Sequence, residues 1–161
     1  MSSWKFLDDT SNLSIQDIRS KIKTIIFEQN QIGLIIIDYL QLMQSFPTKS
    51  ENRVQELSQI TRSLKNLARE FNIPIIALSQ LSRSVENRID KKPILSDLRE
   101  SGSIEQDADL VLMLYKNNSS NKTLLASQLI ELIISKQRNG PIGSIKLKFD
   151  EKRTKFFNLE I

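Results

Sequence analysis

The residue best placed for chemistry in this chain is Asp38, a carboxylate that directly follows an apolar run. Residues 34–37, Leu-Ile-Ile-Ile, have the character of a strand buried on both faces, as a central strand of a parallel sheet is. In doubly wound α/β folds, ligands lie beyond the carboxyl ends of the strands. Nucleotide hydrolases place at that point the acid that organises the Mg²⁺ shell. The run is compatible with this role for Asp38, but taken alone it is more often explained by an ordinary strand-end Asp in an Asx-turn or a helix cap.

Three further sets of polar residues are ambiguous when only their types are considered. Gln80 ends a second apolar run, where a glutamine is most often a solvated polar residue. Lys136 and Arg138 are separated by one residue, so both project from the same face of a strand. Taken alone, that pair is explained by a basic hairpin edge that deters strand addition. The charged cluster at 99–102 would more often be a solvated surface.

Two amphipathic helices are predicted around these residues. Ser14 and Asp17 form a capping pattern, and isoleucines then recur at helical spacing, which predicts a helix over about 15–30. Ser50 caps a second helix, which Asn72 closes. Its apolar stripe consists of Val54, Leu57, Ile60, Leu64, Leu67 and Phe71. Both stripes are expected to face the core, and we assign them no site.

The remaining segments predict strands. Residues 73–78 read as a buried-type strand, 108–115 read as a third strand, and 129–135 with 145–149 read as a hairpin. The stretch 82–103 has neither helical nor strand periodicity. The alternation of strands and helices predicts an α/β fold with a mostly parallel sheet flanked by helices and a C-terminal β-hairpin. No domain boundary or internal repeat is apparent.

Composition excludes several classes of protein. The chain has 161 residues, of which 39% are hydrophobic and 26% charged, as in a folded globular domain. It contains no Cys and no His, which excludes disulfides and thiolate metal sites and disfavours His-based catalysis. The net charge of +4 permits a polyanionic partner. No apolar run approaches the roughly 20 residues that span a bilayer, and no secretory signal is expected.

Four motifs carry a resemblance that covers nearly the whole chain. They are the segments IDYLQLM at 37–43, SQLSR at 79–83, SDLRESGSIEQDAD at 96–109 and KQRNGPIG at 136–143. In content, order and spacing they resemble the C-terminal motor domain of the DnaB family, the RecA-like hexameric replicative DNA helicases. The third motif is long and unusual, which makes chance agreement negligible. Residues 153–157 also resemble the closing segment of the family.

The resemblance implies a nucleotide site that uses ATP and Mg²⁺. Asp38 would hold the Mg²⁺-bound water, and Gln80 would sense the γ-phosphate and relay its state to the DNA-binding loops. Lys136 and Arg138 would reach into the ATP site of the neighbouring subunit, with Arg138 as the arginine finger. Such a finger supplies positive charge where phosphoryl transfer develops negative charge.

The resemblance also implies a DNA-binding loop in the central channel of a hexamer. Arg99, Glu100 and Gly102 match that loop. Arg99 can pair with phosphate, and Gly102 lets the backbone approach the DNA strand closely. A second channel loop is expected at 44–52, near Arg53, on looser similarity. Because no aromatic residues are interleaved, we expect salt-sensitive contacts to the DNA backbone.

The chain lacks a phosphate-binding loop of the form Gly-x-x-x-x-Gly-Lys-Ser/Thr. None of its four glycines precedes a lysine. In the family, this cradle and the catalytic glutamate lie upstream of the residues matched here, as does an N-terminal collar domain. The 161 residues are therefore expected to be the C-terminal portion of a motor domain. Alone, they should neither bind ATP tightly nor unwind DNA, and exposed strand surface should make them poorly soluble. A soluble, cooperatively unfolding monomer would refute this last expectation.

The function that the resemblance implies is part of a replicative DNA helicase, which couples ATP hydrolysis to duplex unwinding by translocating on single-stranded DNA as a ring. The expected partners are single-stranded or forked DNA, copies of itself in a homo-hexamer, an upstream segment with the phosphate-binding loop, and possible primase and loader proteins. The alternative is a non-catalytic DNA- or hexamer-binding fragment or relic. A RecA-like recombination or clock ATPase does not fit residues 97–109. The AT-rich style of composition suits a bacterial cytoplasm or an algal plastid, with no membrane association.

Overall fold

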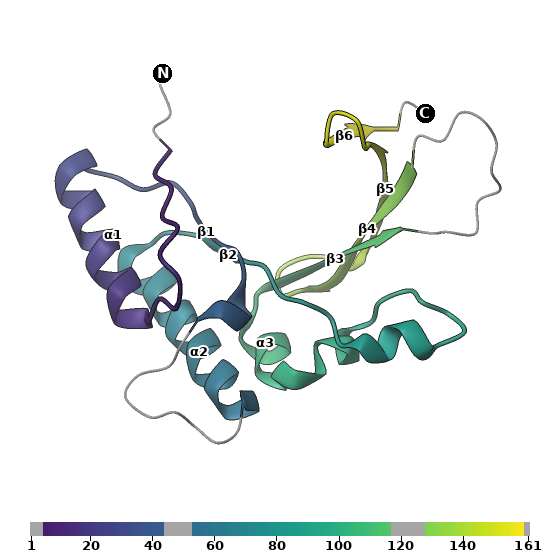
Figure 1. The fold of residues 1–161 in the computed structure, drawn as a ribbon, viewed down its shortest axis with the longest axis horizontal. Coiled ribbons are helices and arrows are strands. Elements are labelled where there is room, and N and C mark those ends of the chain that lie inside the picture. The colour runs from purple at the N-terminus through teal and green to yellow at the C-terminus, as the bar shows by residue number, and fades with distance from the viewer. Residues whose placement is uncertain (1–4, 44–52, 117–127, 160–161) are drawn as a thin grey trace. The chain divides into compact units, whose positions relative to one another are not determined.

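Two units, each with its own sheet, make up the chain, one reaching Gln80 and the other starting at Leu81. The computed structural model describes residues 5–43, 53–116 and 128–159, with only the backbone at 99–101, 103 and 128 (Figure 1). Helices and strands occur in both units, which confirms the predicted α/β class.

The first unit begins with helix α1 (Ile15–Gln29), which starts where the capping pattern predicts. The Ser14 hydroxyl accepts a hydrogen bond from the Asp17 N–H at 3.2 Å, and the Asp17 carboxylate accepts one from the Ser14 N–H at 2.9 Å. This capping box provides acceptors for N–H groups at the start of the helix. Ile18 and Ile22 are buried, so the isoleucine stripe contributes to the core.

Helix α2 (Arg53–Phe71) packs against α1 and against strand β2 (Ile75–Ala77). Its predicted cap, Ser50, lies outside the described residues. Four residues of the predicted stripe are buried: Leu57, Ile60, Leu64 and Leu67. The helix is followed by Asn72 in the left-handed region at φ 54°, a conformation that asparagine tolerates better than most residues. The helix therefore ends where predicted.

Truncation of the α2 core should destabilise the protein strongly. Leu67 has no exposed surface, and Leu67→Ala is expected to lower the free energy of unfolding by about 2–5 kcal/mol, because it removes buried methyl groups and leaves a cavity. Val54→Ala on the same helix, where the side chain is 42% exposed, should cost much less. Urea unfolding of the complete protein would measure both, and equal losses would contradict the assigned core.

Strand β1 (Ile35–Ile37) pairs in parallel with β2, with Ile36 opposite Ile76. The prediction that this strand is buried on both faces is wrong for the described structure. Ile36 is 62% and Ile76 52% exposed, whereas Ile35 and Ile37 are half-buried. Successive side chains point to opposite faces of a sheet, and no described element of the first unit covers the face with Ile36. This exposed apolar face agrees with the expectation that the chain exposes apolar strand surface. The poor solubility expected from such a surface stays a prediction.

The second unit contains a four-stranded antiparallel sheet with the order β3-β4-β5-β6. Its strands are β3 (Leu110–Lys116), β4 (Gln128–Gln137), β5 (Gly143–Asp150) and β6 (Lys155–Asn158). The predicted hairpin is confirmed as β4 and β5, and β6 extends it. This sheet differs from the predicted mostly parallel sheet, because β3 pairs with β4 in the antiparallel direction. The short β4–β5 connection also imposes antiparallel pairing, since parallel strands need a long crossover.

Short helical segments occupy the stretch that showed no periodicity. They are η2 (Arg83–Asn87), η3 (Leu95–Ser101) and α3 (Gly102–Asp107). A small core lies beside them, formed by Leu98, Val111 and Met113 with partly buried Leu95, Ile104, Ala108 and Ile133. Across the described part of the chain, no helix has the length and apolar character needed to cross a membrane.

Candidate functional site

Asp38 and Gln80 lie at the carboxyl ends of the two parallel strands. Beyond the last strand pair, the Leu78 N–H donates to the Ile37 carbonyl and the Leu40 N–H donates to the Leu78 carbonyl, both at 2.9 Å. The two chain segments therefore stay joined after the strands end. Both predicted side chains are exposed at this edge. The peptide bond that follows Asp38 is cis. The structure thus brings the carboxylate and the amide to the same edge of the sheet, where α/β folds bind ligands.

A hydrogen-bonded bridge supports this edge. Gln41, in the short helix η1 (Leu40–Leu42), donates from Nε2 to the Ser79 hydroxyl at 3.0 Å. The Ser79 hydroxyl donates to the Gln80 carbonyl at 3.4 Å. Neither Gln41 nor Ser79 was assigned a role from the sequence, although both lie inside the quoted motifs. Their contact joins residues 38 positions apart, which residue types alone do not reveal.

The residues at this edge fit a Mg²⁺–nucleotide complex better than a metal held by protein alone. Within the ranges that the structure describes, no group of three or more acidic, His or Cys residues could hold a metal ion. Mg²⁺ commonly takes one or two carboxylates and completes its shell with substrate phosphates and water. A single exposed carboxylate, Asp38, is consistent with that arrangement.

Lys136 and Arg138 converge on the C-terminal end of α3. The Lys136 ammonium donates to the carbonyls of Glu105 and Gln106, the second at 3.2 Å. The Arg138 guanidinium donates to the Gln106 carbonyl at 2.9 Å, and its Nε lies 3.5 Å from an Asp109 carboxylate oxygen. Cations are favourable at a helix C-terminus, where carbonyls lack intrahelical donors. Arg138 lies one residue beyond the end of β4, so only Lys136 belongs to the strand, but both side chains reach the same helix end.

The alternative explanation of this pair as a basic hairpin edge stays open. Strand β4 pairs with β3 on one side and with β5 on the other. Lys136 lies opposite Val111 of β3, but the pairing with β5 ends at Ile134 and Gly143. At Lys136 the strand is therefore paired on the β3 side, and edge protection would apply on the other side.

The predicted DNA-binding residues lie where η3 passes into α3. The backbone of Arg99 and Glu100 belongs to η3, and their side chains lie outside the description. Gly102 is exposed, begins α3 with φ −49° and ψ −22°, and a Cβ there would meet no atom within 4 Å. Nothing within the described chain therefore requires glycine at this position, and a role in close approach to DNA stays a prediction.

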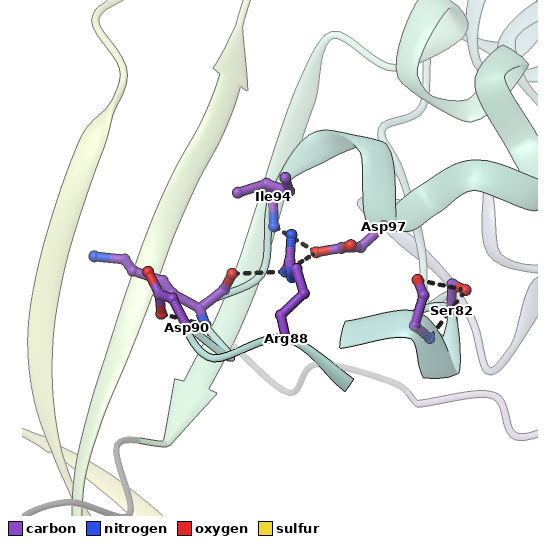
Figure 2. Close-up of polar contacts among 7 residues, drawn as sticks. Ser82, Arg88, Asp90, Ile94 and Asp97 are labelled. Atoms are coloured by element: carbon purple, nitrogen blue, oxygen red, sulfur yellow. Dashed lines mark hydrogen bonds and ion pairs between the residues drawn. The ribbon is translucent and has the colours of Figure 1, made fainter. Parts of the chain in front are cut away.

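An ion pair between a buried carboxylate and a partly exposed guanidinium anchors the backbone just before these residues. The Asp97 carboxylate is nearly inaccessible and accepts hydrogen bonds from the Arg88 guanidinium at 2.7 Å and the Ile94 N–H at 2.8 Å (Figure 2). The Asp97 carbonyl accepts a further hydrogen bond from the Ser82 N–H at 2.9 Å. The ion pair could not be predicted from the sequence, because an arginine and an aspartate nine positions apart in an aperiodic segment give no local signal.

The second predicted channel loop, 44–52, lies outside the described residues. Arg53, expected near it, is described. Its guanidinium donates to the Gln41 carbonyl at 2.8 Å and pairs with Glu56 on the next helical turn. In this structure Arg53 thus ties the start of α2 to η1.

Lys92 and Glu131 connect the loop that holds Arg88 to strand β4. The Lys92 ammonium lies 2.7 Å from a Glu131 carboxylate oxygen. The hydrogen bond from Lys92, together with one from the Ser144 hydroxyl, lowers the pKa of Glu131 below its usual range. The carboxylate form is therefore favoured by folding.

This lowered pKa predicts a specific pH dependence. Because the pKa of Glu131 is lower in the folded than in the unfolded protein, its contribution to stability is present above the unfolded pKa and is lost as pH falls through the folded pKa. Glu131→Gln should therefore destabilise the protein at neutral pH and have a smaller effect at a pH below the folded pKa of Glu131. Urea unfolding of both proteins at the two pH values would measure this, and an equal difference at both would contradict it.

Comparison with known proteins agrees with the geometry. The family model described as the DnaB-like helicase C terminal domain matches residues 2–158. A protein of Trieres chinensis described as a probable replicative DNA helicase is 72% identical over 156 residues, which are 95% of this chain and 34% of that protein. The replicative DNA helicase DnaB of Geobacillus stearothermophilus is 54% identical over 96% of this chain and 34% of its own length. The chain thus spans about a third of these relatives.

Solved structures give the same assignment. A structure described as an ATPase domain superposes with a TM-score of 0.82 at 43% identity, covering 92% of this chain and 52% of that one. A DnaB-like replicative helicase, described with its interactions with primase, gives a TM-score of 0.83 at 43% identity over 95% of this chain and 36% of that one. The family match over nearly all residues, with these likenesses, shows that the chain belongs to the DnaB-like helicase C-terminal domain family.

Proposed function

We propose that this chain is the C-terminal portion of a replicative DNA helicase, which couples ATP hydrolysis to duplex unwinding by translocating on single-stranded DNA as a ring hexamer. The observation that carries the proposal is the position of Asp38 and Gln80 at the carboxyl ends of two paired parallel strands, within a family match over residues 2–158. We take the 161 residues as part of one motor domain, completed by an upstream segment with the phosphate-binding loop.

At the nucleotide site, Asp38 would hold the Mg²⁺-bound water, and Mg²⁺, when bound with ATP, neutralises charge on the phosphates. Gln80 would contact the γ-phosphate. The Gln41–Ser79 hydrogen bond supports this assignment, because it fixes the backbone that carries Gln80. A glutamine held in this way can respond to the presence or loss of one phosphate.

Lys136 and Arg138 would act on the ATP of a neighbouring subunit, with Arg138 as the arginine finger. In the described structure both cations hydrogen-bond to main-chain carbonyls of α3. Such neutral acceptors hold a cation less strongly than a close carboxylate would, and the Asp109 carboxylate beside Arg138 is exposed and lies 3.5 Å from its Nε. Their position at one helix end keeps both side chains together.

DNA would bind at the segment that contains Arg99, Glu100 and Gly102, chiefly through phosphates and therefore with strong salt dependence. The proposed partners are single-stranded or forked DNA and further copies of the complete protein in a homo-hexamer. Primase and a loader are additional candidates, and the structural relative described with primase supports the first of these. We place the protein in an algal plastid or a bacterial cytoplasm, and the greater identity to the Trieres chinensis protein favours the plastid.

ATP hydrolysis by the complete protein, with and without single-stranded DNA, tests this function. We expect Mg²⁺-dependent turnover that single-stranded DNA increases, because the nucleotide and DNA sites are coupled in a translocating motor. Binding of ATP and DNA without turnover would favour the non-catalytic alternative instead. The salt concentration must be the same in the assays with and without single-stranded DNA, because DNA binding depends strongly on salt.

A further inference from the structure

Arg88 closes a loop that ends just before the proposed DNA-binding residues. Its guanidinium Nη2 lies 2.7 Å from the Asp97 carboxylate and 2.9 Å from the Lys92 carbonyl. One side chain therefore bonds to both the middle and the end of the loop 88–97 (Figure 2). The Lys92–Glu131 ion pair fixes the same loop to strand β4.

The end of this loop is anchored in two ways. Asp97 is 4% exposed and accepts hydrogen bonds at its carboxylate and its carbonyl. The next residue, Leu98, is buried beside Val111 and Met113. Arg99 follows at once. A polar anchor and an apolar anchor thus directly precede the first proposed DNA-binding residue, which leaves little freedom in the backbone that presents it.

Stability alone is a weak explanation for this ion pair. The Asp97 side chain is 5% exposed and loses most of its solvation, whereas the Arg88 side chain is 32% exposed, so solvent weakens the attraction between the two charges. Within the described residues, the buried Nε of Arg88 has no hydrogen-bond acceptor, so the guanidinium is incompletely satisfied. We therefore attribute the pair to the geometry that it imposes on its loop.

We propose that Arg88 and Asp97 are positioning residues, which hold the segment 99–102 in the conformation that binds single-stranded DNA. This inference rests on the DNA-binding function proposed for that segment. Neither residue contacts DNA in this scheme. They act through the backbone, by fixing the position of the main chain directly before Arg99.

Binding of a fluorescent oligo(dT) strand to the complete hexamer, at fixed salt and with a non-hydrolysable ATP analogue, tests the inference. Arg88→Met and Asp97→Asn are each expected to raise the Kd about tenfold, because small displacements of a binding group cause large losses. Arg88→Lys keeps the charge and should restore part of the affinity. ATP hydrolysis without DNA should remain near the wild-type rate for all three variants.

Matched controls separate positioning from simple loss of charge. Lys91→Met removes a cation from the same loop, at an exposed residue, and Asp90→Asn removes an exposed carboxylate next to it. Both should change the Kd much less than the Arg88 and Asp97 variants. Arg99→Ala tests the proposed DNA-binding segment itself and should weaken binding directly.

The outcomes distinguish the inference from the function on which it rests. If Arg99→Ala weakens binding while Arg88→Met and Asp97→Asn bind like the wild type, the positioning role is overturned and the proposed function stands. If Arg99→Ala has no effect, the DNA role of the segment fails, and the inference fails with it. If the Arg88 and Asp97 variants lose DNA-independent ATP hydrolysis in the same proportion as DNA binding, their role is general stability and the inference is overturned. If Arg88→Met does not fold, the Kd values of Arg88→Lys and Asp97→Asn for the oligo(dT) strand still test the positioning role.

Discussion

Arg138→Ala in the complete hexamer is expected to reduce ATP turnover by about 10³-fold or more, with nucleotide affinity nearly unchanged. An arginine finger stabilises charge that develops in the transition state of phosphoryl transfer, so its loss affects turnover rather than binding. The guanidinium is available for such a role because its described partners are a neutral carbonyl and an exposed carboxylate, at Gln106 and Asp109. Steady-state hydrolysis and equilibrium nucleotide binding on the same protein would measure the two effects.

Arg153→Ala is the matched control for this variant. Arg153 lies in the same unit, between β5 and β6, and its side chain is 74% exposed, with an Asp150 oxygen 3.8 Å from Nε. Its loss removes the same charge and should leave turnover near the wild-type rate. Equal losses of nucleotide binding and turnover in Arg138→Ala would count against the finger role.

Asp38→Asn is expected to reduce Mg²⁺-dependent turnover by about 10- to 100-fold, the range seen when a residue that orients a metal shell is replaced. The substitution keeps the size of the side chain and removes its charge at the carboxyl end of β1. Part of the loss should be recovered at high Mg²⁺ concentration, because the weakened metal affinity can be offset by mass action. Turnover measured over a range of Mg²⁺ concentrations would show this shift.

Asp9→Asn provides the control, since Asp9 is an exposed carboxylate in the same unit. It should have the wild-type Mg²⁺ dependence. If Asp38→Asn hydrolyses ATP with wild-type rate and wild-type Mg²⁺ dependence, then Asp38 is the ordinary strand-end aspartate of the alternative explanation.

The long elements could be predicted because their signals are local. The Ser14–Asp17 capping box and the buried side chains of α2 follow patterns that repeat every three or four residues. The hairpin of β4 and β5 was likewise marked by two apolar runs around a turn segment. These patterns depend on neighbours in the sequence, so no knowledge of the tertiary structure was needed.

The features that escaped prediction depend on contacts between distant residues. The short segments η2, η3 and α3 complete too few turns to show a periodic stripe. Burial of Ile36 was overestimated, because composition shows that a strand is apolar but does not show whether both faces are covered. The contact of Lys136 with the Gln106 carbonyl spans 30 residues, and only the fold brings these groups together.

The proposed function makes these residues part of a motor that separates DNA strands. It is tested by strand separation of a forked duplex, in the presence of ATP and Mg²⁺, by the complete protein, in which this chain is joined to the proposed upstream segment with the phosphate-binding loop. We predict ATP-dependent unwinding by the complete protein and none by the 161 residues alone. A complete protein that binds ATP and forked DNA but leaves the duplex intact would contradict the proposed helicase function.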